Sequence, residues 1–284
     1  MSSIVAANSR LSADLGTPAC LLNLRTILPS LPENHARIAH FVMLNPAEFL
    51  DVDARRIGYL CGTSEATVVR FCQRIGYRGL SEMKKVLARE LAANLVSSRV
   101  TGKVGRENSV LDHVFSDCVQ AVGDTLSGIN RSRFNSIANA IARCEHLYLL
   151  GAGGSAHIAQ VAALNFLSVG FQTFAFVDPI QQLAAAKLAT ARDVAVAVTY
   201  SGNQSEVAEA LQTAKKKQAL CVGITSFQHS LISKSSHELL LMFIPAETLR
   251  GQTGAHRVAQ IALLDALAVR AAEVKGSSNR ARKR

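Results

Sequence analysis

The fold of the first part of the chain is decided by one stretch, Thr63-Ser64-Glu65-Ala66-Thr67-Val68-Val69-Arg70-Phe71-Cys72-Gln73-Arg74-Ile75. Its apolar side chains recur at helical spacing, so Val68, Phe71, Cys72 and Ile75 share one face of a helix. Ser64 or Thr63 can cap the start of this helix by accepting a hydrogen bond from a free backbone N–H. The opposite face carries polar side chains that are able to bond base edges or phosphates: Glu65, Thr67, Arg70, Gln73 and Arg74.

The residues just before this helix supply a second helix and a tight turn. Residues 53–62 have the pattern of a short helix that ends at a glycine. Gly58 has no Cβ and would let the two helices approach closely, and Gly62 can adopt a turn conformation that costs other residues energy. Two helices joined by such a turn are typical of a helix-turn-helix motif. From these residues alone, an ordinary helical hairpin remains the alternative.

The composition bounds the class of protein. A chain of 284 residues has room for two domains, and 49% hydrophobic residues can build their cores. No apolar run reaches membrane-spanning length and the first residues do not resemble a signal peptide, so we expect a cytoplasmic protein that does not enter the membrane. The six cysteines are scattered without a C-x-x-C pair, which favours reduced core thiols over a disulfide framework or a metal site: Cys20, Cys61, Cys72, Cys118, Cys144 and Cys221.

The net charge of +10 is unevenly distributed. Residues 1–106 hold 14 Lys and Arg against 8 Asp and Glu, whereas residues 107–270 hold 12 of each kind. Residues 271–284 hold 5 basic side chains against 1 acidic one. Positive charge therefore accompanies the candidate helix-turn-helix, as expected of a nucleic-acid-binding domain joined to a neutral one.

The sequence pattern divides the chain into five parts. We expect a disordered N-terminus at 1–18, a helical helix-turn-helix domain at 19–95, a Ser/Gly/Lys-rich linker at 96–109, a second domain at 110–273 and a basic tail at 274–284, in which residues 280–284 are disordered. Within the helical domain, further helices are predicted at 19–28, from Pro32, from Pro46 and at 81–95.

The second domain alternates strands with helices. After helices at 110–126 and 131–142, strands are predicted at 146–150, 173–177, 194–199, 220–225 and 239–244. Helices are predicted at 155–169, 180–188, 204–216, 231–236 and 256–272. Near-continuous apolar strands with helical crossovers indicate a doubly wound parallel sheet covered on both faces. In such sheets, ligands bind at the carboxyl ends of the strands.

Three predicted strand ends carry glycines and hydroxyl groups. Gly151-Ala152-Gly153-Gly154-Ser155 runs directly into a helix, whose N-terminus favours an anion. Thr199-Tyr200-Ser201-Gly202-Asn203-Gln204-Ser205 also precedes a helix, with Asn203 as a plausible cap. Thr225-Ser226 forms the third loop. Hydroxyls and backbone amides that converge on one point suit a phosphate monoester.

A dinucleotide site is the alternative for the same loops. Gly151, Gly153 and Ala156 fit the pattern G-x-G-x-x-G/A, and Asp178 follows the next strand, where a ribose-binding acid could lie. The second hydroxyl-bearing loop is not required by a dinucleotide and favours the sugar phosphate.

Both halves together resemble the MurR/RpiR-type transcriptional regulators, which have an N-terminal helix-turn-helix and a C-terminal sugar isomerase (SIS) domain. Residues 64–72 followed by Gly76-Tyr77-Arg78-Gly79 carry the first resemblance. Gly151-x-Gly153-x-Ser155, residues 199–202 and Ile224-Thr225-Ser226 carry the second. The SIS pattern usually has a hydroxyl residue after Ser-Gly-x, whereas this chain has Gln204 there and a hydroxyl only at Ser205.

The resemblance implies a bacterial regulator rather than an enzyme. It implies a homodimer or homotetramer that binds double-stranded operator DNA and responds to a phosphorylated sugar or sugar acid, without a cofactor or metal. The residues expected at the ligand are Gly151, Gly153, Ser155, Thr199, Ser201, Gly202, Gln204, Ser205, Thr225 and Ser226. Those expected on DNA are Ser64, Glu65, Thr67 and Arg70 near bases, and Arg74, Arg78 and Lys84 on phosphates.

Two other functions remain open. A sugar-phosphate isomerase needs a base beside the substrate carbon, for which Glu247, His256 and His157 are the candidates. A regulator that senses a dinucleotide would use the glycine loop after the first strand.

Overall fold

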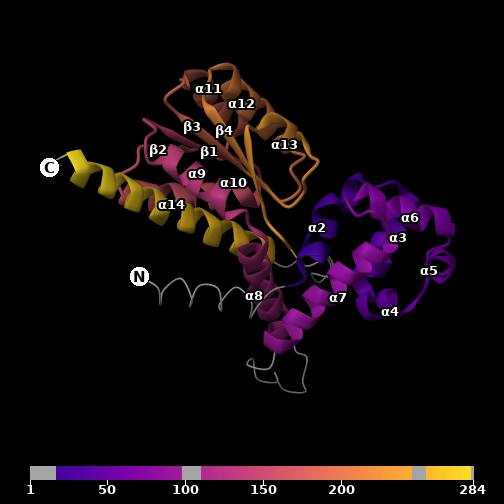
Figure 1. The fold of residues 1–284 in the computed structure, drawn as a ribbon. Helices are drawn as coiled ribbons and strands as arrows, with labels where there is room; N and C mark the ends of the chain where they lie inside the picture. Colours follow the sequence, from indigo (N-terminus) through magenta and orange to yellow (C-terminus); the bar gives the residue numbers. More distant parts are fainter. Residues whose placement is uncertain (1–16, 98–109, 245–253, 283–284) are drawn as a thin grey trace. The chain divides into compact units, whose positions relative to one another are not determined.

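The computed structural model describes residues 17–97, 110–244 and 254–282 (Figure 1). The chain divides close to residue 109 into two compact units. Three regions with predictions lie outside the described residues: 1–16 of the expected disordered N-terminus (1–18), 98–109 of the expected linker (96–109), and Glu247.

The first unit is entirely helical in its described part. Its elements are α2 (Ala19–Ile27), the short 3-10 helix η1 (Leu28–Ser30), α3 (Glu33–Leu44), α4 (Pro46–Asp51), α5 (Ala54–Leu60), α6 (Glu65–Arg74) and α7 (Leu80–Ser97). The predicted apolar stripe of α6 is confirmed, because Val68, Phe71 and Cys72 are completely buried. They pack into one core with side chains from the surrounding helices, including Phe49 and Met83.

The second unit is a doubly wound α/β domain. Its helices are α8 (Val110–Gly128), α9 (Arg131–Ile141), α10 (Gly154–Ser168), α11 (Pro179–Leu188), α12 (Ser205–Lys216), α13 (Leu231–Ser235) and α14 (Ala255–Arg282). Its strands are β1 (Leu147–Gly151), β2 (Thr173–Ala175), β3 (Val194–Val198), β4 (Leu220–Thr225) and β5 (Glu238–Leu241). The strands pair in parallel in the order β2-β1-β3-β4-β5, which is the flavodoxin-like order and confirms the predicted doubly wound parallel sheet.

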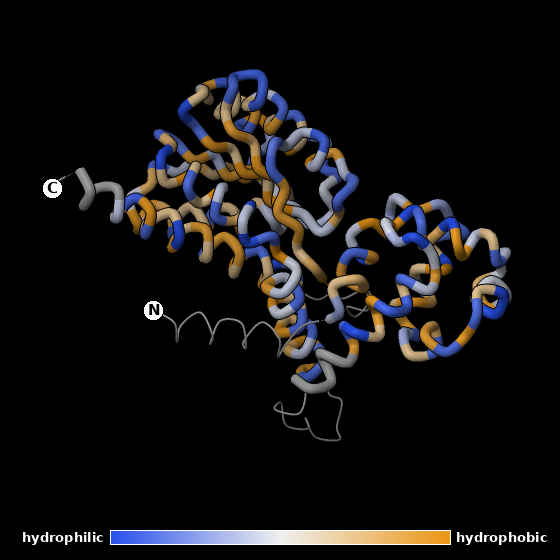
Figure 2. The backbone as a smooth tube through the Cα atoms, viewed as in Figure 1, coloured by the Kyte–Doolittle hydropathy of each residue, from blue (hydrophilic) through white to orange (hydrophobic). Residues whose placement is uncertain are grey.

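The sheet is covered on both faces. Helices α9, α10 and α14 contribute to the hydrophobic core on one face, and α11, α12 and α13 contribute to the core on the other (Figure 1). Because both faces are buried, the central strands are continuously apolar, as in the Val-Ala-Val-Ala-Val run of β3, and they lie as hydrophobic segments inside the domain (Figure 2). Among the described helices, none is long and apolar enough to cross a membrane.

The structure differs from two local predictions. The helix predicted at 256–272 is longer, because α14 continues to Arg282, so residues 280–282 of the tail expected to be disordered are helical, and residues 283–284 lie outside the described part of the chain. Lys275 anchors this part of the helix, because its Nζ donates to the carbonyl of Gly170 at 2.7 Å and lies 4.5 Å from the centre of the Phe171 ring. Asn203 does not cap α12; its Oδ1 accepts a hydrogen bond from the Leu231 N–H at 3.3 Å and so supports the start of α13.

Candidate functional site

The helix-turn-helix is formed by α5 and α6, and each helix has its own cap. Asp53 Oδ1 accepts from the Arg56 N–H at 2.7 Å, and Ser64 Oγ accepts from the Thr67 N–H at 3.2 Å. The prediction of a capped start at Ser64 is confirmed. Each cap satisfies a backbone N–H that the helix itself leaves free, so both helices begin at defined residues.

Two glycines shape the connection between these helices. A Cβ at Gly58 would lie 2.9 Å from the carbonyl oxygen of Thr63 and 3.1 Å from the Glu65 nitrogen, so only glycine allows α5 to approach the start of α6 this closely. Gly62 has φ +61°, the left-handed conformation that side chains disfavour. Both predictions for these glycines are confirmed.

The outer face of α6 is polar and accessible. Ser64, Glu65, Arg70 and Arg74 are exposed and Thr67 is partly exposed. The sequence predicted that these side chains contact DNA, and the structure leaves each of them at least partly accessible to solvent. The helix is thus held by its apolar face and presents its polar face.

Two further predicted DNA contacts differ from each other. The Arg78 side chain is 93% exposed and forms an i,i+4 ion pair with Glu82, whose pKa is lowered mainly by the hydrogen bond from the Arg78 N–H. Lys84 instead turns inward, where its Nζ donates to the carbonyls of Leu50, at 2.9 Å, and Val52, at 2.5 Å. Lys84 therefore supports the end of α4, and we leave it out of the proposed DNA surface.

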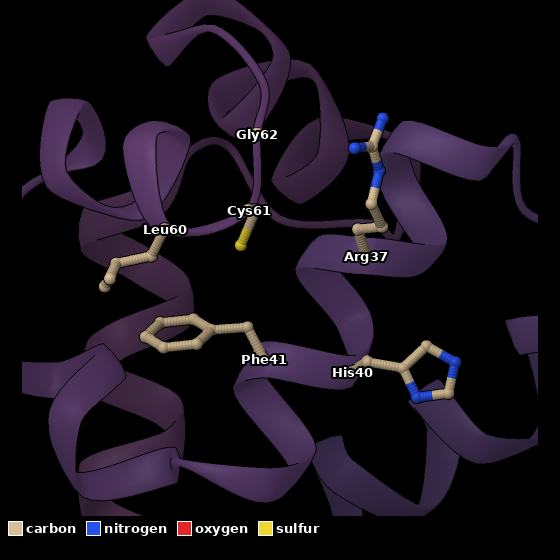
Figure 3. Close-up of a pocket in the computed structure, with 6 residues that line it drawn as sticks. All are labelled: Arg37, His40, Phe41, Leu60, Cys61 and Gly62. Atoms are coloured by element: carbon tan, nitrogen blue, oxygen red, sulfur yellow. The ribbon is translucent and has the colours of Figure 1, made fainter.

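Other basic groups surround the turn and were not singled out from the sequence. Arg37 and His40 of α3, with Phe41, line an open hollow of about 390 Å³ beside the turn residues Cys61 and Gly62 (Figure 3). Burial raises the pKa of the Cys61 thiol, although the Arg37 guanidinium opposes this shift, so the thiol stays protonated at neutral pH. Arg37 and His40 lie beside the turn because of the way α3 packs, and no local sequence pattern in α5 and α6 reveals that packing.

His35, in α3, lies against the buried face of α6. Its ring makes an edge contact with Phe71, with 5.9 Å between ring centres. Burial, followed by the positive charges of Arg74 and Arg70, lowers the pKa of His35 below its ordinary value of 6.5. The imidazole is consequently neutral at neutral pH.

In the second unit, the loop after β1 is held by a buried glutamine. The Gln182 side chain accepts from the Gly151 N–H at 3.2 Å and donates to the Gly151 carbonyl at 2.7 Å. A Cβ at Gly151 would lie 2.9 Å from the backbone of Ser155, and Gly153 has φ +54°. Glycines at these two positions allow the chain to turn directly into α10.

The hydroxyl of Ser155 is buried in the first turn of α10 and contacts α14. Gln260 Nε2 lies 3.1 Å from Ser155 Oγ, and Gln260 Oε1 lies 3.3 Å from the same atom. Both side chains are at least nine-tenths buried. Gln260 was not among the residues expected at the ligand, because it is 105 residues away from Ser155 along the chain.

The loop after β3 contains a second pairing of a glutamine with a serine. Gln204 Nε2 donates to Ser201 Oγ at 3.1 Å, while Gln204 Oε1 accepts from Thr199 Oγ1. Thr199 Oγ1 also accepts from the Gly202 N–H at 3.0 Å. Gln204 thus orders the loop from within, which explains how this chain accommodates an amide where the SIS pattern has a hydroxyl.

The remaining loop residues lie around β4. Thr225 Oγ1 donates to the Tyr200 carbonyl at 3.0 Å, whereas Ser226 Oγ is buried without a hydrogen-bond partner among the described residues. Gly202 has φ +70°, and a Cβ there would collide with Ser230 Oγ. Ser205, at the start of α12, donates to the neighbouring carboxylate of Glu206.

Two residues were candidates for the alternative functions: Asp178 for a dinucleotide site and His256 for an isomerase. Asp178 caps α11, since its Oδ1 accepts from the Gln181 N–H at 2.9 Å. His256 packs on the Tyr200 ring, with 4.8 Å between ring centres. Burial and the adjacent Arg257 lower the pKa of His256 below its ordinary value.

A separate polar cluster lies at the amino edge of the sheet. Glu145, His146 and Asp193 place potential metal-ligating atoms within 4.8 Å of one another. Asp193 accepts hydrogen bonds from His146 and Thr190, and Glu145 pairs with Arg192 at 2.7 Å. These partners give the cluster a structural role in joining the segments before β1 and β3.

A helix-turn-helix unit joined to a doubly wound unit with hydroxyl-bearing strand-end loops defines a ligand-responsive transcriptional regulator. Residues 19–94 match the family model of the helix-turn-helix domain of the rpiR family, and residues 140–270 match that of the SIS domain. The chain therefore belongs to the RpiR-type regulators with a C-terminal SIS domain, as the sequence resemblance predicted.

Similar proteins have the same organisation or share one of its domains. An uncharacterized HTH-type transcriptional regulator of Caldanaerobacter subterraneus subsp. tengcongensis is 28% identical over 255 residues, which are 89% of this chain and 90% of that protein. The Vibrio vulnificus NanR protein complexed with ManNAc-6P is similar over 92% of this chain and 97% of its own, with 23% identity and a TM-score of 0.54. The sugar isomerase domain of an RpiR transcription factor from Sphaerobacter thermophilus is similar over 60% of this chain and 98% of its own, with 19% identity and a TM-score of 0.50. The two structures share the fold with this chain.

Proposed function

We propose that a phosphorylated sugar or sugar acid binds the strand-end loops of the SIS domain and thereby controls the affinity of the helix-turn-helix domain for operator DNA. The observation that carries this proposal is the pairing of Ser155 and Ser201 with glutamine amides. A hydroxyl that accepts a hydrogen bond from an amide N–H keeps its own proton for another acceptor. Two such hydroxyls, next to the N-termini of α10 and α12, suit the oxygens of a phosphate group.

A solved structure of the same fold supports this ligand class. The Vibrio vulnificus NanR protein is complexed with ManNAc-6P, and its similarity extends over 92% of this chain, so that it includes both units. The effector can control DNA binding only if it has different affinities for two conformations of the protein, one that binds DNA and one that does not.

In the DNA-binding domain, we propose that α6 enters the major groove. Ser64, Glu65, Thr67 and Arg70 would lie nearest the base edges, and Arg74 and Arg78 would contact phosphates. Glu65 can accept from cytosine N4, and the Arg70 guanidinium can donate two hydrogen bonds to guanine.

Exposed apolar side chains on α8 support a homodimer or homotetramer. Leu111, Phe115 and Val119 recur at four-residue intervals, and each is more than half exposed. Such a stripe can pack against the same stripe of a second copy in a two-fold arrangement. Sedimentation analysis of Phe115→Lys should show a smaller assembly than the wild type; an unchanged mass would exclude this face.

The function is tested with an operator selected from random duplexes. Thermal shifts first identify a phosphorylated sugar that stabilises the protein. Fluorescence anisotropy then measures operator affinity with and without it. Ser155→Ala and Ser201→Ala should keep operator binding and lose the response to the sugar. Ser168→Ala is the control, since its hydroxyl bonds the Asn165 carbonyl at the far end of α10. A wild-type response in both loop variants would contradict the proposed site.

An isomerase is the second candidate, because a neutral His256 beside Tyr200 is able to accept a proton. Turnover of pentose or hexose phosphates by the purified protein, lost in His256→Gln, would favour it over a purely regulatory role.

A further inference from the structure

The first two turns of α14 bring a cation and an amide to the loop after β1. Arg257 and Gln260 are three positions apart and so lie on neighbouring parts of the helix surface. Gln260 contacts Ser155, and a Cβ at Gly154 would lie 2.8 Å from Arg257 Nε. Helices α10 and α14 run alongside each other in the domain (Figure 1).

The charge of Arg257 lies beside a helix N-terminus. Its side chain is exposed, and no carboxylate within residues 17–97, 110–244 and 254–282 forms an ion pair with it. Burial and the Arg257 charge lower the pKa of the neighbouring His256, so its imidazole stays uncharged at neutral pH and Arg257 is the cation at this place. The Arg257 guanidinium and the backbone N–H of Gly154, at the N-terminus of α10, therefore form a region that attracts an anion.

Gln260 determines which way the Ser155 proton points. A hydroxyl has one proton and two lone pairs, so it can accept from Gln260 Nε2 and donate elsewhere at the same time. Ser155 Oγ lies 3.1 Å from Gln260 Nε2 and 3.3 Å from Gln260 Oε1, and the shorter contact with Nε2 favours the arrangement in which the amide donates and the serine proton is free for a ligand. Because Gln260 is fully buried, its amide has no competing water and can hold the hydroxyl in the donor orientation.

We propose that Arg257 and Gln260 belong to the effector site. Arg257 pairs with a dianionic phosphate ester, and Gln260 is the positioning residue that keeps Ser155 as a hydrogen-bond donor. This inference rests on the proposed function and extends the site to a third segment, the start of α14. It also requires that the ligand is an anion, since a guanidinium at this place favours a phosphate ester over an uncharged sugar.

Calorimetric titration of the full-length protein with inorganic phosphate tests the proposal. Arg257→Gln should weaken phosphate binding about 10- to 100-fold, the usual loss of a charge-assisted hydrogen bond. Arg257→Lys should recover part of the affinity, because the charge remains. The control is Arg192→Gln, an exposed arginine at the amino edge of the sheet, which should bind phosphate as the wild type does.

A double-mutant cycle separates positioning by Gln260 from a general structural role. Gln260→Met fills the same space, and its effect should vanish when Ser155 is already alanine. Should Gln260→Met fail to fold, Gln260→Glu serves instead: its carboxylate accepts a hydrogen bond from the Ser155 hydroxyl, which then no longer donates to phosphate, so phosphate binding should be lost. Full additivity in the cycle, or wild-type affinity of Gln260→Glu, would overturn the role of Gln260.

The outcomes distinguish this inference from the function on which it rests. Wild-type affinity in Arg257→Gln, together with weakened binding in Ser155→Ala and Ser201→Ala, overturns the role of Arg257 and leaves the proposed site in place. Unchanged phosphate binding in both serine variants, or no binding to the wild type, overturns the site and this inference together.

Discussion

Replacing Gly58 with alanine adds one methyl group where α5 meets the start of α6. Alanine is favoured over glycine in a helix by about 0.5–1 kcal/mol, so helix propensity alone predicts stabilisation. The added Cβ would, however, lie 2.9 Å from the Thr63 carbonyl oxygen and 3.1 Å from the Glu65 nitrogen. Both are backbone atoms, and the clash is relieved only if the two helices separate.

Overpacking of this kind costs about 1–3 kcal/mol, which exceeds the gain in propensity. We expect a net loss of about 1 kcal/mol, which corresponds to a fall of about 4–8 °C in the unfolding transition of a domain of this size. The same displacement shifts α6, the helix proposed to enter the major groove, so operator affinity should also fall at temperatures where the variant is folded. Calorimetry and fluorescence anisotropy of the full-length variant measure the two effects.

Gly276→Ala is the matched control, because Gly276 is also helical and no atom lies within 4 Å of an added Cβ. It should not lower the transition of the second domain. A rise in the transition temperature of Gly58→Ala would show that the helix propensity of alanine outweighs the steric clash of its Cβ. It would refute the close approach of the two helices.

Three other outcomes follow from the first domain. Lys84→Met should lower its unfolding free energy by about 1–3 kcal/mol, because the carbonyls of Leu50 and Val52 lose their charged donor; an unaltered denaturation midpoint would contradict the inward position of Lys84. His35 has a lowered pKa when folded, so its stabilising effect is complete above its unfolded pKa of 6.5 and is lost as pH falls through the folded value. Urea midpoints at pH 7.5 and 5.5 should therefore differ less in His35→Gln than in the wild type, and equal differences would exclude His35 as the source. Arg70→Ala should weaken binding to the selected operator by about 1–3 kcal/mol and relax the preference at one base pair, as measured by competition; an equal loss on random DNA would remove its assignment to a base.

Local sequence patterns were sufficient to predict most of the fold. Apolar runs such as that of β3 are unambiguous because both faces of the sheet are buried, and the turn between α5 and α6 depends on residues that adjoin in sequence, Gly58, Gly62 and Ser64. The predicted strands accordingly differ from the observed ones by only a few residues at their ends.

What could not be predicted depends on distant partners. The acceptors of Lys84 are 34 and 32 residues away, so its sequence neighbourhood suggests a free cation on a solvated helix. Gln260 reaches Ser155 across 105 residues, a relation that exists only after α14 has packed against α10. The contact of the α14 start with the glycine loop therefore became visible only in the folded domain.

The inward position of Lys84 has a consequence for how the regulator responds to ionic strength. Each phosphate that a protein neutralises releases condensed counterions from DNA, and the logarithm of the binding constant falls with that of the salt concentration by about 0.9 per contact. A side chain whose ammonium group is already engaged by Leu50 and Val52 releases none. Each copy of the chain therefore releases fewer counterions than its basic sequence suggests, and operator occupancy should fall less with rising salt concentration than it would if Lys84 contacted a phosphate.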